Sequence, residues 1–214
     1  AQCDSIFTFF LLLSFYSALK SRPWRGCIFF GIAFAFKLQA IFFAPLLLLL
    51  CIKNRLWFRH LLTIPAVYLL SILPAWIAGR NFLDLLTVYF NQAGQYHNLS
   101  KNAPNFWSFL ASRQDSGLSL FGIMLAGAAV LFLLYFLWER CRTLSDDTLL
   151  TAALAFLLAI PFFLPHMHER YFFPADLFAI LYALNKPKRF PVPLLVIGAS
   201  TVSYLPFLFG ESPV

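Results

Sequence analysis

The densest group of ionisable side chains in this sequence is the run His166-Met167-His168-Glu169-Arg170-Tyr171, which we call the His166 run. It lies between two long apolar stretches with almost no loop around it. Ionisable residues at a membrane boundary are costly and usually functional, whereas an ordinary surface turn more often uses Asn, Gly and Ser. If the run is helical, His166, Glu169 and Arg170 share one face and His168 points elsewhere. We predict that the run binds a ligand; the alternative is an interfacial turn whose charges simply reach water.

Zinc binding is the weaker interpretation of the two histidines in this run. His residues two apart on a helix diverge, and no third ligand is evident. The sequence also lacks Gly-rich phosphate loops, paired nucleophile and base motifs, and helical His-Glu zinc motifs. We therefore predict no metal and no cofactor, and we exclude a soluble nucleotide-using enzyme.

A second charged position interrupts an apolar stretch at Phe36-Lys37-Leu38-Gln39. A lysine in a low-dielectric cavity is a strong point charge that can hold an anionic phosphate. The alternative is an ion pair with a carboxylate outside this sequence, for example in the spans expected upstream. We name Lys37 and Gln39 as candidate residues of a phosphate site.

Three further positions are ambiguous by themselves. In the run Asn102-Ala103-Pro104-Asn105-Phe106-Trp107, which we call the Asn102 run, Trp107 alone indicates a membrane-interface anchor and Asn105 a helix cap. Asp4 precedes an apolar stretch, where it either caps a helix or serves as an acid in a cavity. Asp176 begins another stretch, where a carboxylate stabilises the exposed N–H groups of a helix start.

The whole chain has the composition of a membrane protein. Of its 214 residues, 61% are hydrophobic and 12% are charged, which is well outside the usual soluble range. The net charge of +7 comes from short basic clusters between apolar stretches, a pattern that reflects membrane topology rather than a nucleic-acid surface. We predict an all-α, polytopic transmembrane helical bundle that contacts membrane lipid and no nucleic acid.

Apolar stretches that can cross the hydrocarbon core predict about six full spans. They lie at 5–19, 61–78, 118–137, 149–165, 171–184 and 192–209. The stretch 27–52 is too long for one span and is interrupted at Lys37. Because the basic clusters on both sides of it should face the cytoplasm, we predict two half-length helices, 27–36 and 40–52. Lys37 and Gln39 then lie at a mid-membrane apex.

The same rule places the other polar segments on the outer face. These are the chain start, the loop 79–117, the His166 run and the C-terminal end. Within the loop, 82–90 is predicted to form an amphipathic helix at the membrane interface. We treat 1–214 as a single transmembrane domain. Because a membrane-length stretch follows Asp4 with no initiator Met or signal sequence before it, we expect further spans upstream.

In series, these runs resemble the motifs of the GT-C fold glycosyltransferases, polytopic enzymes that use a polyprenyl-phosphate sugar at the outer or luminal membrane face. The similarity is greatest to the bacterial GPI-mannosyltransferase-like branch. It rests on Gln2-Cys3-Asp4-Ser5, Phe36-Lys37-Leu38-Gln39 with Pro45 after it, the Asn102 run and the His166 run. The endoplasmic-reticulum glucosyltransferases that extend lipid-linked oligosaccharides are similar in three places. They carry a His-Val-His-Glu-Lys run where this chain has Met167 and Arg170.

The resemblance implies an integral membrane hexosyltransferase, with mannose as the first sugar to test and a polyprenyl-phosphate-linked sugar as its partner. The implied donor-phosphate residues are Lys37, Gln39, His166, His168, Glu169, Arg170 and Tyr171. The implied outer-loop substrate contacts are Asn102, Asn105 and Trp107. In that family the catalytic Asp lies in an early outer loop that this chain lacks. We therefore expect the donor-binding half here, with Asp4, which matches a later family acid, as the candidate catalytic carboxylate.

Two other classes of protein stay open. In a transporter or channel, Lys37, Glu169 and the histidines would form a proton or anion relay at a broken helix. In a structural membrane subunit, the ionisable run would be buried and paired, with no cavity beside it. No oligomeric state follows from the sequence.

Overall fold

The computed structural model describes residues 3–93, 98–110 and 116–209. Most of these residues are helical, and the chain divides into two compact units, Ala1–Tyr96 and His97–Val214. Each unit is a bundle of apolar helices. The all-α, polytopic class predicted from the composition is confirmed.

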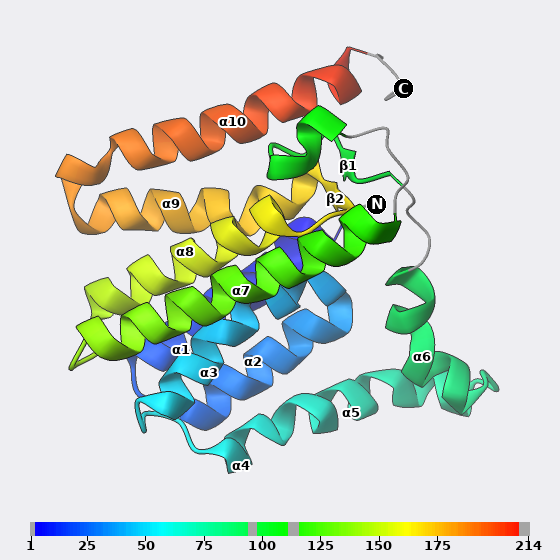
Figure 1. Cartoon of the computed structure of the whole chain (residues 1–214). Helices are drawn as coiled ribbons and strands as arrows, with labels where there is room; N and C mark the ends of the chain where they lie inside the picture. The colour runs from blue at the N-terminus through cyan, green and yellow to red at the C-terminus, as the bar shows by residue number, and fades with distance from the viewer. Residues whose placement is uncertain (1–2, 94–97, 111–115, 210–214) are drawn as a thin grey trace. The chain divides into compact units, whose positions relative to one another are not determined.

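The first unit is built around α2. In order, its elements are α1 (Asp4–Leu19), α2 (Pro23–Phe36), the 3-10 helix η1 (Leu38–Phe43), α3 (Ala44–Ile52), α4 (Phe58–Leu61), α5 (Thr63–Ile77) and α6 (Phe82–Ala93) (Figure 1). α2 packs against both α1 and α5. Gly31 permits the second contact, because a Cβ there would lie 3.0 Å from the Val67 Cβ and 3.3 Å from the Ile64 Cα.

The predicted interruption at Lys37 is present. Lys37 is extended (φ −157°, ψ 129°), which ends α2 at Phe36, and the chain then turns back through η1 into α3. Its depth in a membrane stays a prediction, but the structure gives its place along the bundle. Lys37 lies beside Asp4 at the first residue of α1, so the apex is level with the start of α1 rather than halfway along it. The reason is length: α2 has 14 residues against 16 in α1, so it retraces nearly the whole of its neighbour.

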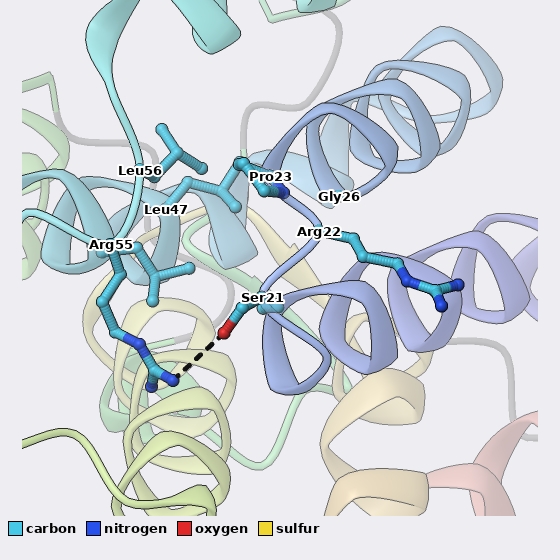
Figure 2. A pocket seen from close by; sticks show the side chains of 9 residues that line it. Ser21, Arg22, Pro23, Gly26, Leu47, Arg55 and Leu56 are labelled. Atoms are coloured by element: carbon cyan, nitrogen blue, oxygen red, sulfur yellow. Dashed lines mark hydrogen bonds between the residues drawn. The ribbon is translucent and has the colours of Figure 1, made fainter.

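The opposite end of this bundle carries basic side chains (Figure 2). Arg55 donates to the Ser21 Oγ across 3.5 Å, while Arg22 points away from Arg55. The basic clusters before and after 27–52 therefore lie at the same end of this unit. The cavity between them has a volume of about 20 Å³, which holds roughly one water molecule. It is too small for a substrate.

The second unit is a series of helices joined at one end by a short parallel strand pair. Its elements are β1 (Ser100–Lys101), the 3-10 helix η2 (Phe106–Leu110), α7 (Ser116–Arg140), α8 (Asp146–Phe163), β2 (Met167–His168), the 3-10 helix η3 (Glu169–Phe172), α9 (Phe173–Asn185), the 3-10 helix η4 (Pro187–Arg189) and α10 (Pro191–Leu208). From α7 to α10, each helix packs against the next along the chain (Figure 1).

The long helices coincide with the predicted spans to within a few residues. In the described part of the chain, three helical segments have the length and hydropathy to cross a membrane: Phe58–Ile77, Ser116–Arg140 and Asp146–Phe163. α1, α9 and α10 match three further predicted spans in position. α9 begins later than predicted, at Phe173, because the residues before it form η3.

Basic residues also gather at one end of the second unit. Asp147, in the first turn of α8, accepts hydrogen bonds from both terminal nitrogens of Arg189, and Lys186 Nζ lies 3.1 Å from its Oδ2. The bond to Asp147 raises the pKa of the Arg189 guanidinium. This group holds the end of α9 and η4 against the start of α8, at the end of the unit opposite the His166 run.

α6 occupies the segment predicted to be an interfacial helix. Asn81 immediately precedes it, and the Asn81 Oδ1 accepts from the Leu83 amide at 2.8 Å, as the side chain of an N-cap residue does. The location of α6 at a membrane surface stays a prediction, as does the single-domain organisation of 1–214.

Candidate functional site

The Asn102 run and the His166 run are brought together by the strand pair of the second unit. Ser100 pairs with Met167 and Lys101 with His168 in parallel register, and an isolated bridge joins Asn102 to His168. Figure 1 shows β1 and β2 side by side near the end of α8. Two segments that the sequence singled out separately therefore form one site.

The His166 run is not one continuous helix: Met167 and His168 form β2, and Glu169 begins the 3-10 helix η3. The predicted helical face shared by His166, Glu169 and Arg170 is therefore absent. His166 adopts a left-handed conformation (φ 62°), and its N–H donates to the Leu99 carbonyl at 2.8 Å. Asn102 is also left-handed (φ 53°). Such conformations are uncommon outside Gly, although Asn and His adopt them more readily than most residues. They are held here because the strand pair satisfies the backbone, and residues of this kind cluster at functional sites.

The imidazole of His166 bridges two segments of this unit. Its Nδ1 lies 2.8 Å from the Asn98 carbonyl oxygen and its Nε2 lies 3.0 Å from the Ser119 Oγ. A tautomer with hydrogen on Nδ1 donates to the carbonyl and accepts from the hydroxyl. The ring thereby joins the segment before β1 to α7. This is a positioning role, and phosphate binding by His166 stays a prediction.

Trp107 packs between the end of α8 and α7, next to the candidate site. It is 1% exposed, and its indole N–H donates to the carbonyl of Phe163, the last residue of α8, at 2.7 Å. Its ring packs over Gly122, where an added Cβ would lie 2.7 Å from the Trp107 Cζ2. Trp107 is therefore a buried residue of this unit and not the interface anchor that it resembles in isolation.

Asn105 caps η2, as its position in the sequence suggested. Its Oδ1 accepts from the Trp107 amide at 3.1 Å, and the residue is 3% exposed. Among the described residues, its Nδ2 has no hydrogen-bond partner. An unsatisfied buried amide costs about 1–3 kcal/mol, so this N–H group can donate to a further acceptor. Substrate contact by Asn105 stays a prediction.

The charged residues of the His166 run lie directly after β2. Glu169 is 8% exposed, and its Oε2 lies 3.9 Å from the His168 Nδ1, beyond hydrogen-bonding distance. The Arg170 guanidinium carbon lies 5.8 Å from the Tyr171 ring centroid, and the His168 and Tyr171 rings are 5.3 Å apart. The run thus packs its aromatic and ionisable groups against one another.

An apolar groove begins beside these residues. Its volume is about 490 Å³, its walls come from α7, α8 and α10, and Pro104 and Phe172 stand at the site end. These two residues are the chain neighbours of Asn105 and Tyr171. Ser200 contributes a hydroxyl to the wall, which donates to Asp176 at 2.8 Å. Asp176 stands in the first turn of α9 as predicted, and it also ties α9 to α10.

In the first unit, Lys37 forms an ion pair with Asp4. The side chains are 18% and 13% exposed, and the Lys37 Nζ lies 5.4 Å from the Phe7 ring centroid. Lys37 therefore has a carboxylate partner, as the alternative interpretation expected, but that partner is Asp4 of this chain and not a residue upstream. Asp4 directs its side chain to Lys37 from the first turn of α1, and Gln39 lies half-buried in η1.

The sequence profile of glycosyltransferase family 87 matches residues 1–164. The chain belongs to glycosyltransferase family 87. It is accordingly a membrane glycosyltransferase, as the resemblance to GT-C enzymes implied. No curated protein and no solved structure matches it.

The family 87 match covers part of the candidate site. Asp4, Lys37 and the Asn102 run lie inside the matched residues, and the His166 run begins just after Leu164. Within the described ranges of this glycosyltransferase, no three His, Cys, Asp or Glu side chains are grouped as a metal site would need.

Several residues at the candidate site of this glycosyltransferase could not be identified from the sequence. Ser119 and Gly122 lie in a mostly apolar helix, and Phe163 contributes only a backbone carbonyl. A Gly in such a helix often marks close packing, which is the one signal that was available. The partners of Ser119 depend on a long-range fold and leave no local pattern.

Proposed function

We propose that this glycosyltransferase transfers a hexose, mannose being the first candidate, from a polyprenyl-phosphate sugar to an acceptor hydroxyl at the outer membrane face. The bond between the sugar C1 and the phosphate oxygen breaks, and a bond between C1 and the acceptor oxygen forms. The acceptor proton passes to a carboxylate. The polyprenyl phosphate leaves with the electron pair, and cations stabilise its charge.

The observation that carries this proposal is the convergence of the Asn102 run and the His166 run at one end of an apolar groove. A lipid-linked sugar likewise has a polar part and an apolar part, because its sugar-phosphate head is joined to a long isoprenoid chain. The groove suits the chain, because its wall is almost entirely apolar. The two runs suit the head, because they carry the amide, carboxylate and guanidinium groups.

Within the head site, Asn105 is suited to a sugar or phosphate oxygen. Its Nδ2 is buried and lacks a partner in the described chain. Arg170 is the first candidate for the leaving phosphate, since its planar fork can bind two oxygens at once. His166, His168 and Tyr171 are the next candidates in this unit. Glu169, which lies beside His168, is proposed to orient these groups. Lys37 and Gln39, which belong to the first unit, are proposed as donor-phosphate residues because of the resemblance to GT-C enzymes.

Asp4 and Lys37 are proposed to act as a pair. The ammonium of Lys37 is held by the Asp4 carboxylate at the end of α2, where a fixed cation can attract an anionic headgroup. Because that carboxylate already serves Lys37, we propose that the base which deprotonates the acceptor is another carboxylate of the full-length protein.

The proposal is tested by replacing Arg170 in the full-length, membrane-reconstituted protein. Arg170→Ala is expected to abolish transfer from a polyprenyl-phosphate sugar while expression stays intact. Arg142→Ala, which removes a basic residue after α7 at the other end of the unit, serves as the control and is expected to keep wild-type turnover.

Unchanged turnover by Arg170→Ala would contradict the assignment. Movement of a labelled solute into proteoliposomes without any glycosyl product would instead favour a transporter or channel.

A further inference from the structure

Tyr89 of α6 contacts the end of α2 within the first unit. Its hydroxyl lies 2.6 Å from the Phe34 carbonyl oxygen and 3.1 Å from that of Ala35. The Tyr89 and Phe34 ring centroids are 5.2 Å apart, with the ring planes inclined at 61°. Burial raises the pKa of Tyr89 to about 12, with Tyr68 nearby as the second cause, so the hydroxyl stays protonated and can donate.

These two carbonyls belong to the last turn of α2. In a continuous helix, each carbonyl accepts from the N–H four residues later. The extended conformation of Lys37 ends the helix at Phe36 and takes those N–H groups away. In an apolar protein such carbonyls are costly to leave unpaired. The Tyr89 hydroxyl replaces the missing donor.

The same turn carries Lys37. The Lys37 N–H still bonds to the Ala33 carbonyl at 3.1 Å, so the lysine backbone is fixed by the last turn of α2. Its ammonium then reaches Asp4. A change in the direction of that turn moves the ammonium, because the side chain extends from the point where the helix ends.

We propose that Tyr89 is a positioning residue, which caps the broken end of α2 and thereby aims the Lys37 ammonium at the donor phosphate. The second half of this statement rests on the proposed function of Lys37. The first half concerns the backbone alone and can be measured without any transfer reaction.

The chain offers a matched control in Tyr68. Tyr68 belongs to the same aromatic cluster, with its ring 5.8 Å from that of Tyr89 and 5.9 Å from that of Phe34. Its hydroxyl donates to the Leu85 carbonyl at 2.9 Å. Tyr68→Phe therefore removes a hydroxyl from this cluster without touching the end of α2.

The first measurement is hydrogen exchange of the backbone amides of residues 35–41 in the membrane-reconstituted full-length protein. Tyr89→Phe is expected to speed exchange there, and Tyr68→Phe is expected to leave it at the wild-type rate. Equal exchange in the two variants would overturn the cap, whatever the protein catalyses.

The second measurement is the KM for a polyprenyl-phosphate sugar. Loss of one part-buried hydrogen bond to the end of α2 predicts a rise in KM of roughly five- to tenfold for Tyr89→Phe, with a smaller change in kcat. In a Lys37→Gln background the same substitution is expected to add nothing, since residues that act as a unit are not additive.

A full additional rise in KM in that background would overturn the positioning role. If Lys37→Gln by itself leaves transfer unchanged, the proposed use of Lys37 fails, and the exchange measurement still decides whether Tyr89 caps α2.

Discussion

The His166 ring has one nitrogen against the Asn98 carbonyl and the other against the Ser119 hydroxyl. Trp107 and Tyr89 follow the same principle, because each donates to a carbonyl at a helix end. In a medium of low dielectric such bonds are strong, and a lost partner is correspondingly expensive. These three side chains join segments that are distant in the sequence.

The substitution Ser119→Ala tests the hydrogen bonds through which the His166 ring joins two segments. The variant leaves the Nε2 of His166 without the Ser119 hydroxyl, and the loss of a part-buried hydrogen bond of this kind costs about 0.5–1.5 kcal/mol. We expect a lower melting temperature and at least a severalfold loss of glycosyl transfer, measured on the reconstituted protein.

Ser203→Ala is the matched control, because the Ser203 hydroxyl donates to the Ala199 carbonyl of its own helix at 2.9 Å. It is expected to behave as wild type. If Ser119→Ala matches this control in both melting temperature and glycosyl transfer, the hydrogen bond between Ser119 and His166 contributes to neither.

Among the elements, α7 meets the site at Gly122. A Cβ at this position would lie 2.7 Å from the Trp107 Cζ2 and 2.9 Å from the Pro165 Cδ. Trp107 cannot retreat freely, since its indole is bonded to the Phe163 carbonyl. Gly122→Ala is therefore expected to destabilise the protein by about 1–3 kcal/mol, measured by thermal unfolding, and to lower transfer.

Gly127 provides the comparison in the same helix. A Cβ there meets nothing within 4 Å, and Ala is the better helix former by about 1 kcal/mol. Gly127→Ala should leave the melting temperature unchanged or raise it. A Gly122 variant as stable as the Gly127 variant would show that Trp107 is not held as described.

The helices were predictable because apolar stretches of membrane length can be recognised directly from the amino-acid composition. The break at Lys37 was predictable for the same reason, since a charge interrupts such a stretch. Its pairing with Asp4 was not fixed by any local pattern, and neither were β1 and β2. Strands of two residues have no alternation to detect, and their register depends on segments that are separated by α7 and α8.

In the second unit as a whole, the groove joins the site to the surfaces of three helices. Ala159 lies in its α8 wall. Ala159→Phe is expected to fill part of the groove and to reduce transfer from a long-chain polyprenyl donor by roughly tenfold, about 1.4 kcal/mol. Transfer from a donor with a chain of one or two isoprene units should change little. Initial rates with the two donors measure the difference.

Ala128→Phe adds the same ring at an exposed position of α7 and is expected to reduce transfer from neither donor. An equal loss with long and short donors in Ala159→Phe would mean that the ring disturbs the fold instead of the isoprenoid chain. Thermal unfolding of both variants checks this directly.

Among the candidate site residues too, some features could be predicted from the sequence and others could not. The His166 run and the Asn102 run were predicted by their unusual composition, and their meeting required the structure. The roles of His166 and Trp107 within the site changed once their partners were known, because a side chain's function depends on the atoms that face it. The family match confirms the class of enzyme and leaves the sugar, the donor and the acceptor as proposals.

The pairing of β1 with β2 also orders events during biosynthesis. Ser100 leaves the ribosome before α7 and α8, while its partner Met167 follows them. The strand β1 therefore has no partner until both helices have been synthesised. A nascent chain that stops before Met167 cannot close the site, however completely its earlier helices are folded.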